Sequence, residues 1–298
     1  MNKVSEDQLS NWTKPAFDNE AERAEATQES VKDAINNHQT LKNLSIRVFP
    51  KGSYANNTNV RHDSDIDIAV EFQEMINLSY DSGVSFSDTG LSPYTGISEQ
   101  VFKSHLRSAL ISEFGDKVDT SGNKVFKIRG SDKILNADVI PCTTFRLYHS
   151  PTRFSQGIEL ILNVPDGKRH FNFPDQHQEN GINKNNSTSK RFKSIVRILK
   201  NANNFMTQDG KDPRYHSFMI ESLAYNLPTN TYLYNEPWRD LLNQLCVDAW
   251  QYLKLDEPSS ENGRWFEAND IKFLFHPNQR WSRPDAKQFI LDVYNLIK

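Results

Sequence analysis

The sequence predicts an α+β protein made of two lobes that share a cleft. In the first half, strand-like segments with alternating polarity lie between helical segments, whereas the end of the chain reads as helices alone. A length of 298 residues, 37% of them hydrophobic, is long for one simple domain and suits two lobes. We place a mixed-sheet core at 1–165, with its N-terminal helix packing on the second lobe, and a helical lobe at 166–298.

The first half contains the predicted sheet. Residues 18–42 predict a helix, because Val31, Ala34 and Ile35 fall at helical spacing. Residues 74–98 are rich in Ser, Gly, Asp and Thr and predict a surface loop, and residues 97–114 return to helical spacing. Strands are expected at 44–49, 65–72, 124–128, 134–141, 143–148 and 157–164.

The second half predicts a helical lobe. The asparagine-rich segment 180–187 is expected to be a loop that leads into a helix cap, with a possible contact to a ribose or base. Ser187 and Pro284 are plausible helix starts, since serine caps helix N-termini and proline fits the first turn. Helices are expected at 187–206, 214–227, 237–255 and 284–297.

Composition and charge exclude several classes of protein. A net charge of −3 and a pI near 6.3 do not predict nonspecific electrostatic binding to nucleic acid. The two cysteines, Cys142 and Cys246, lack metal-site spacing and form no disulfide framework, which favours a reduced, cytoplasmic setting. The first residues lack the apolar core of a signal peptide, and we find no apolar run that would span a membrane.

The segment DIDIAV places two carboxylates on one face of a strand. Asp65 and Asp67 are two residues apart, so their side chains leave the same face, while Ile66 and Ile68 face the core. Such close carboxylates repel each other unless cations lie between them, and hard oxygen ligands suit Mg²⁺ or Mn²⁺. The alternative for an isolated Asp-x-Asp is an edge strand with solvated acids.

A glycine–serine turn precedes this strand. Gly52 allows close approach of backbone to backbone or ligand, and a turn that opens a short helix presents free N–H groups to a phosphate. Ser53 adds a hydroxyl donor. Asp138, a polar residue in an apolar strand, would complete a set of three acids, although it could also be a simple strand-end residue before Pro141. Together these residues predict a site for a nucleoside triphosphate and its metal ions.

The block GSYANNTNVRHDSDIDIAV resembles the signature of the DNA polymerase beta-like nucleotidyltransferase superfamily, Gly-Ser followed by Asp-x-Asp. With Asp138 in ADVIPC and the blocks at 180–200 and 215–223, the pattern resembles the bacterial cGAS/DncV-like nucleotidyltransferases, or CD-NTases. These enzymes make cyclic oligonucleotide signals in anti-phage defence. The order of the motifs is most similar to clade E.

The resemblance implies a polymerase beta-like core with a mixed sheet and a C-terminal helical lobe that closes a nucleotide cleft. It implies that Asp65, Asp67 and Asp138 hold two Mg²⁺ ions, with Mn²⁺ as a substitute, and that Asp138 activates an attacking ribose hydroxyl. Gly52 and Ser53 would hold the triphosphate. The implied product is a cyclic oligonucleotide second messenger, either a cyclic dinucleotide or a related small ring, and similarity to clade E favours one that contains a pyrimidine.

The resemblance also assigns residues in the helical lobe. Lys200 and Ser217 match a lysine and a serine that reach the triphosphate, and Phe218, or Tyr215 nearby, would stack on a base. For each of these a structural alternative stays open: Lys200 on the wet face of an amphipathic helix, Ser217 as an ordinary helix residue, and the aromatic rings in the core.

Other functions remain open at this point. The same chemistry would serve a template-independent transferase that adds nucleotides to RNA, protein or a small molecule, and a linear product would distinguish it. A nucleotide-binding regulator without catalysis is a third possibility. We expect a monomer that uses NTPs such as ATP or UTP, reaches an effector protein only through its product, and requires neither a membrane nor a nucleic acid.

Overall fold

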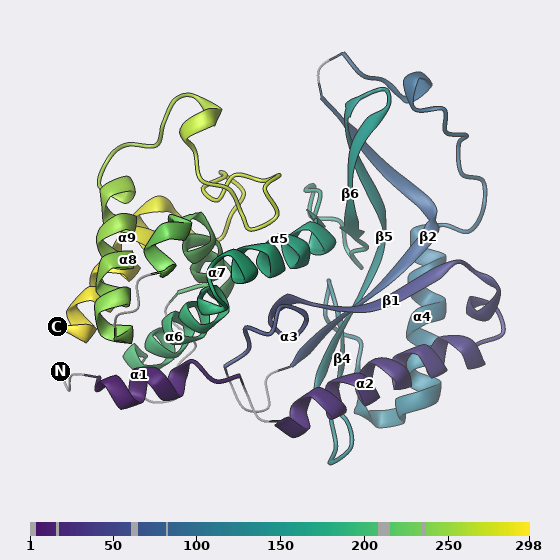
Figure 1. Ribbon diagram of the computed structural model, residues 1–298. Coiled ribbons are helices and arrows are strands. Elements are labelled where there is room, and N and C mark those ends of the chain that lie inside the picture. Colours follow the sequence, from purple (N-terminus) through teal and green to yellow (C-terminus); the bar gives the residue numbers. More distant parts are fainter. Residues whose placement is uncertain (1–3, 16–17, 61–64, 82, 208–214, 234–236) are drawn as a thin grey trace. The chain divides into compact units, whose positions relative to one another are not determined.

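The computed structural model describes residues 4–15, 18–60, 65–81, 83–207, 215–233 and 237–298, and the chain divides into two compact units. The sheet unit comprises residues 17–55 and 61–174, and the helical unit comprises residues 1–16, 56–60 and 175–298 (Figure 1). This division lies somewhat beyond the predicted position at 165. None of the described helices has the length and apolar character needed to cross a bilayer.

The sheet unit is built on one mixed sheet. Its strand order is β1-β2-β5-β4-β3, with β6 beside β5 and β7 beside β6. The central pair β2 and β5 is parallel, and the other pairs are antiparallel. The strands are β1 Ile46–Lys51, β2 Ile66–Tyr80, β3 Val118–Asp119, β4 Phe126–Ile128, β5 Ala137–Ser150, β6 Arg153–Leu160 and β7 Phe171–Asn172.

Helices α2 (Asp18–Asn37) and α4 (Glu99–Phe114) pack together with the sheet (Figure 1). Alternate residues of β2, such as Ile66 and Ile68, share a buried apolar cluster with residues of both helices. The opposite face of β2 therefore carries Asp67. The helix predicted at 18–42 is α2, which packs on the sheet, and a shorter helix before it, α1 (Glu6–Trp12), buries Leu9 in the core of the helical unit.

Two strands are longer than predicted. β2 continues to Tyr80, although a loop was expected from residue 74. The continuation was not predicted because a register shift between Phe72 and Ile76 interrupts the alternation of polar and apolar residues. β5 is one strand where two were expected. Pro141 lies where β5 changes its antiparallel neighbour from β4 to β6, so the strand tolerates a residue without an N–H group.

A buried lysine ties α4 to two loops of the sheet unit. Lys103 is 2% exposed, and its Nζ donates to the carbonyl oxygens of Ile161 at 2.6 Å and Asn123 at 3.0 Å. Burial lowers the pKa of Lys103 from 10.5 to about 8. No local pattern of residues around Lys103 indicates a buried amine.

We predict that Lys103→Met lowers the free energy of unfolding at pH 7 by about 1–3 kcal/mol, because two buried carbonyl groups lose their donor. Between pH 8 and 10.5 the unfolded chain binds more protons at this lysine than the folded protein does. The stability of the wild type relative to the variant should therefore rise across that range. Urea unfolding of both proteins at pH 7 and pH 9.5 measures this, and an unchanged difference would contradict the prediction.

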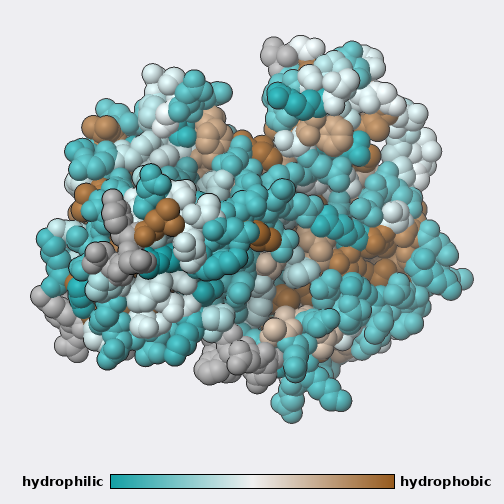
Figure 2. All heavy atoms as spheres, viewed as in Figure 1, coloured by the Kyte–Doolittle hydropathy of each residue, from teal (hydrophilic) through white to brown (hydrophobic). Residues whose placement is uncertain are grey.

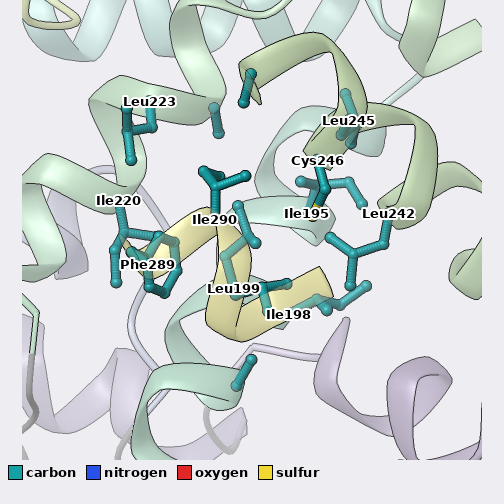
Figure 3. Close-up of a cluster of buried hydrophobic side chains, with 14 of the residues drawn as sticks. Ile195, Ile198, Leu199, Ile220, Leu223, Leu242, Leu245, Cys246, Phe289 and Ile290 are labelled. Carbon is teal, nitrogen blue, oxygen red and sulfur yellow. The ribbon is translucent and has the colours of Figure 1, made fainter. Parts of the chain in front are cut away.

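The helical unit has its own apolar core. Helices α6, α7, α8 and α9 supply its centre, where Ile195, Leu223, Leu245 and Phe289 are among the buried side chains (Figure 3). The helices of this unit are α1 Glu6–Trp12, α5 Pro174–Ser187, α6 Arg191–Met206, α7 Ser217–Asn226, α8 Trp238–Leu253 and α9 Arg283–Ile297. On the visible face of the molecule, hydrophobic side chains form patches among hydrophilic ones (Figure 2).

Several predictions for individual residues and segments can be compared with the structure. The segment 180–187 is the last part of α5 rather than a loop, and Ser187 ends this helix instead of starting the next. The prediction for α9 is confirmed: Pro284 lies in its first turn, and Ser282 caps it by accepting from the Asp285 amide. Cys142 and Cys246 are both free and buried, which agrees with a packing role.

Candidate active site

Four charged residues form one row across the sheet. Asp67 on β2 lies directly opposite Asp138 on β5 in the parallel pair. Lys51 on β1 is the partner of Asp67, and Lys127 on β4 is the partner of Asp138. The sheet therefore brings two of the three predicted acids together and flanks each of these two with a lysine. Asp65 lies one residue before β2 with an exposed side chain.

The electrostatics of this row disfavour two bare carboxylates. Burial raises the pKa of Asp67, an effect that Lys51 opposes and Asp65 reinforces. Burial also raises the pKa of Asp138, where Lys127 opposes the shift and the charges of Asp65 and Asp67 add to it. All three aspartates thus interact electrostatically. Ionising them together requires compensating positive charge.

The donor set fits a hard divalent cation. Asp138 Oδ1 is buried and accepts no hydrogen bond from the described residues, with Lys127 Nζ at 3.6 Å in an ion pair. Carboxylate oxygens are the ligands that Mg²⁺ and Mn²⁺ prefer. Within the described ranges, no three His, Cys, Asp or Glu side chains already converge as a complete set of metal ligands. Asp67 and Asp138 stand in register on neighbouring parallel strands.

Gly52 meets this row at close range. It follows Lys51 directly, has a φ of 70° and opens the four-residue helix α3 (Gly52–Ala55), where Ser53 is half-buried. A Cβ atom at position 52 would lie 2.5 Å from Asp67 Oδ2. Both the left-handed backbone and the contact with Asp67 require glycine here. The predicted Gly-Ser turn and the acidic strand are therefore neighbours in space as well as in sequence.

The remaining predicted residues belong to the helical unit. Lys200 is 4% exposed, and its Nζ donates to Glu221 Oε2 at 2.8 Å and to the hydroxyl and carbonyl oxygens of Thr58 at 2.9 and 3.2 Å. Lys200 therefore does not lie on a solvent-exposed face of its helix. Ser217 is the exposed first residue of α7, and the half-buried Phe218 contacts His177 edge to face, 5.2 Å between ring centroids.

Several residues near the predicted site residues were not predicted from the sequence. Lys51 and Lys127 become notable only through strand register, since neither belongs to a motif that the sequence makes visible. Glu221 and Thr58 surround the buried ammonium group of Lys200 and were likewise not expected. Tyr215, considered for base stacking, is buried and packs its ring against Phe289. Its place in the core favours the structural alternative for that residue.

Comparison with known proteins agrees with this architecture. Residues 179–298 match the family model of the cGAS/DncV-like nucleotidyltransferase C-terminal helical domain. The sequence is 33% identical to a cyclic dipyrimidine nucleotide synthase, CdnE, of Legionella pneumophila, in an alignment that covers 96% of each chain. It is 30% identical over 100% of both chains to the protein of the same name from Cecembia lonarensis.

Solved structures give the same result. The Rhodothermus marinus CdnE c-UMP-AMP synthase with Apcpp and Upnpp has a TM-score of 0.82 and 25% identity, covering 98% of this chain and 96% of that one. The Elizabethkingia meningoseptica CdnE cyclic dinucleotide synthase with GTP and Apcpp has a TM-score of 0.78 and 28% identity, covering 98% of both chains. The predicted α+β fold with a mixed-sheet core and a helical C-terminal part is confirmed.

Proposed function

The chain belongs to clade E of the cGAS/DncV-like nucleotidyltransferases, the CD-NTases, and we propose that it joins two NTPs into a cyclic dinucleotide with release of pyrophosphate. The observation that carries this proposal is the pairing of Asp67 with Asp138 beside Gly52 in the sheet unit. Solved relatives that hold GTP, Apcpp or Upnpp support NTPs as substrates. The product would act as a second messenger in anti-phage signalling and reach its effector protein by diffusion.

Three carboxylates carry the proposed chemistry. Asp65, Asp67 and Asp138 would hold divalent cations, which the family uses in catalysis, and we propose Mg²⁺ with Mn²⁺ as a substitute. When bound, such ions neutralise the phosphates and stabilise the charge that develops during in-line displacement at the α-phosphorus. Asp138 would also take the proton of the attacking ribose hydroxyl.

Other residues would bind the nucleotides. Gly52 and Ser53 would hold the triphosphate through backbone N–H groups and the serine hydroxyl. Lys200 and Ser217 would reach the triphosphate, and Phe218 would stack on a base. For Lys200 this requires the ammonium group to exchange at least one of its internal acceptors for a phosphate oxygen.

The named products of the relatives differ in their bases. The names of the Legionella and Cecembia relatives specify dipyrimidine products, and that of the Rhodothermus structure specifies UMP and AMP. We therefore propose a pyrimidine-containing product. An Elizabethkingia relative at 29% identity is named a cyclic dipurine nucleotide synthase, so the bases need a direct measurement. We further propose that the protein is cytoplasmic, since NTPs are supplied inside the cell. We also propose that it is a monomer of 34.4 kDa.

The proposed function predicts a defined product. Incubation with Mg²⁺ or Mn²⁺ and all four NTPs, each labelled in turn with ³²P at the α-phosphate, is expected to give a phosphatase-resistant species with the mass of a cyclic dinucleotide. Uridine or cytidine label should enter it. A ladder of linear products would instead support a template-independent transferase, and nucleotide binding without pyrophosphate release would support a regulator that has lost catalysis. Either result would overturn the proposal.

A further inference from the structure

Residues 56–60 are a short excursion of the chain into the helical unit. They follow α3 directly, and Asp65 comes five positions after Val60 in the sequence. Asn56, Thr58 and Asn59 are buried. The excursion therefore lies, along the chain, between the Gly-Ser turn and the first acid of the proposed site.

Thr58 is fixed by an ion pair. Its hydroxyl donates to Glu221 Oε2 at 2.8 Å and accepts from Lys200 Nζ at 2.9 Å, and Lys200 also bonds the Thr58 carbonyl oxygen at 3.2 Å. Lys200 and Glu221 are themselves 2.8 Å apart. All three side chains are buried, so water cannot replace a lost partner, and each hydrogen bond constrains the position of the backbone at residue 58.

His177 extends the network to Asn56. Its Nε2 lies 2.9 Å from Glu221 Oε1, and Asn56 Nδ2 lies 3.1 Å from that Nε2 and 3.4 Å from Nδ1 of the same ring. The two oxygens of Glu221 thus serve two residues of the excursion, one directly and the other through His177.

Asn57 is held through its backbone. Arg197 NH1 donates to the Asn57 carbonyl oxygen at 2.6 Å, and Asn57 has a φ of 53°, in the left-handed region. A non-glycine residue in this conformation persists where its surroundings enforce it. Three consecutive residues are therefore held by side chains of three helices, α5, α6 and α7.

We propose that Thr58, Glu221 and His177 are positioning residues for nucleotidyl transfer. Their network fixes residues 56–60 and so restricts the chain that leads directly from this anchor back to Ser53 and Gly52. The inference rests on the proposed function, because that function places Gly52 and Ser53 at the triphosphate. Reacting groups that are held in advance need not be ordered during the reaction.

Two buried threonines provide a matched test. Thr58→Val removes the hydroxyl that Glu221 and Lys200 share, whereas Thr231→Val removes a hydroxyl that donates to Asp248 at 2.6 Å in the same unit. Both changes should lower the melting temperature by similar amounts. Only Thr58→Val is expected to lower kcat by about 10- to 100-fold, with KM for the NTPs changed less, and Thr58→Ser should restore most of kcat.

Hydrogen exchange without nucleotide gives a second readout. Amides of residues 52–60 should exchange faster in Thr58→Val and unchanged in Thr231→Val. Equal kinetic effects of the two valine variants, or unchanged exchange in Thr58→Val, would overturn the inference while the wild type still makes its product. If Thr58→Val does not fold, Glu221→Gln takes its place with the same expectations. A wild type without product would contradict the proposed function instead, and the exchange experiment would still test the anchor.

Discussion

Asp67→Asn is expected to lower the rate of nucleotidyl transfer by about 1,000-fold or more and to leave the protein as stable as the wild type, or more stable. The loss of rate follows from removing a carboxylate that we propose as a metal ligand at the centre of the cross-strand row, because preorganised charge supplies most of the catalysis in phosphoryl transfer. Asparagine keeps the shape of the side chain, so packing beside Gly52 should persist.

The expected gain in stability comes from the pKa of Asp67. Burial raises this pKa, so the folded protein holds the proton more tightly than the unfolded chain does, and ionisation at neutral pH works against folding. This destabilisation is absent below the unfolded pKa and is complete above the folded one. A neutral amide removes it, and the difference in stability between wild type and variant should shrink as the pH falls toward 4.

Thermal melting at pH 7 and pH 4, product formation, and Mn²⁺ binding followed by electron paramagnetic resonance check this prediction together. Asp116→Asn is the control, since the Asp116 side chain is 92% exposed and lies in a surface ion pair with Arg129. It should leave rate, melting and Mn²⁺ binding unchanged. A variant of Asp67 that melts lower and still turns over at the wild-type rate would show that this carboxylate is structural.

The residues of the proposed site that belong to local sequence patterns could be predicted from the sequence. Asp65 and Asp67 stand out because a period of two sets them against Ile66 and Ile68, and the Gly-Ser turn is a local signal as well. Lys51 and Lys127 were not predictable, since their place beside the acids follows from the register of β1 and β4, which is a long-range property. The ends of β2 and β5 were missed for a similar reason.

The burial of Lys200 could not be predicted from local pattern either. Its helix reads as amphipathic with basic residues facing water, yet the ammonium group is buried because Glu221 and Thr58 provide acceptors. Thr58 lies 142 positions away in the chain, so no local pattern could indicate it. Helix α5 was missed for a compositional reason: its asparagines favour loops and caps in isolation, and packing overrides that preference.

Gly52→Ala is the second change with a large expected effect: a loss of about 100-fold in the rate of product formation. Two costs combine at this position. The φ of 70° places a residue with a Cβ in the left-handed region, at about 1–2 kcal/mol. The added methyl group would also lie 2.5 Å from Asp67 Oδ2, so either the carboxylate or the turn must move.

Gly90→Ala separates the two costs. Gly90 has a φ of 67°, nearly that of Gly52, but a Cβ there meets nothing within 4 Å. We expect both variants to lose about 1–2 kcal/mol in the free energy of unfolding from backbone strain, and only Gly52→Ala to lose activity and Mn²⁺ affinity. Urea unfolding, product formation and Mn²⁺ titration of the two variants decide between the explanations. If both keep full activity, the close approach of Gly52 to Asp67 has no part in catalysis; if both lose it equally, left-handed strain alone accounts for the glycine.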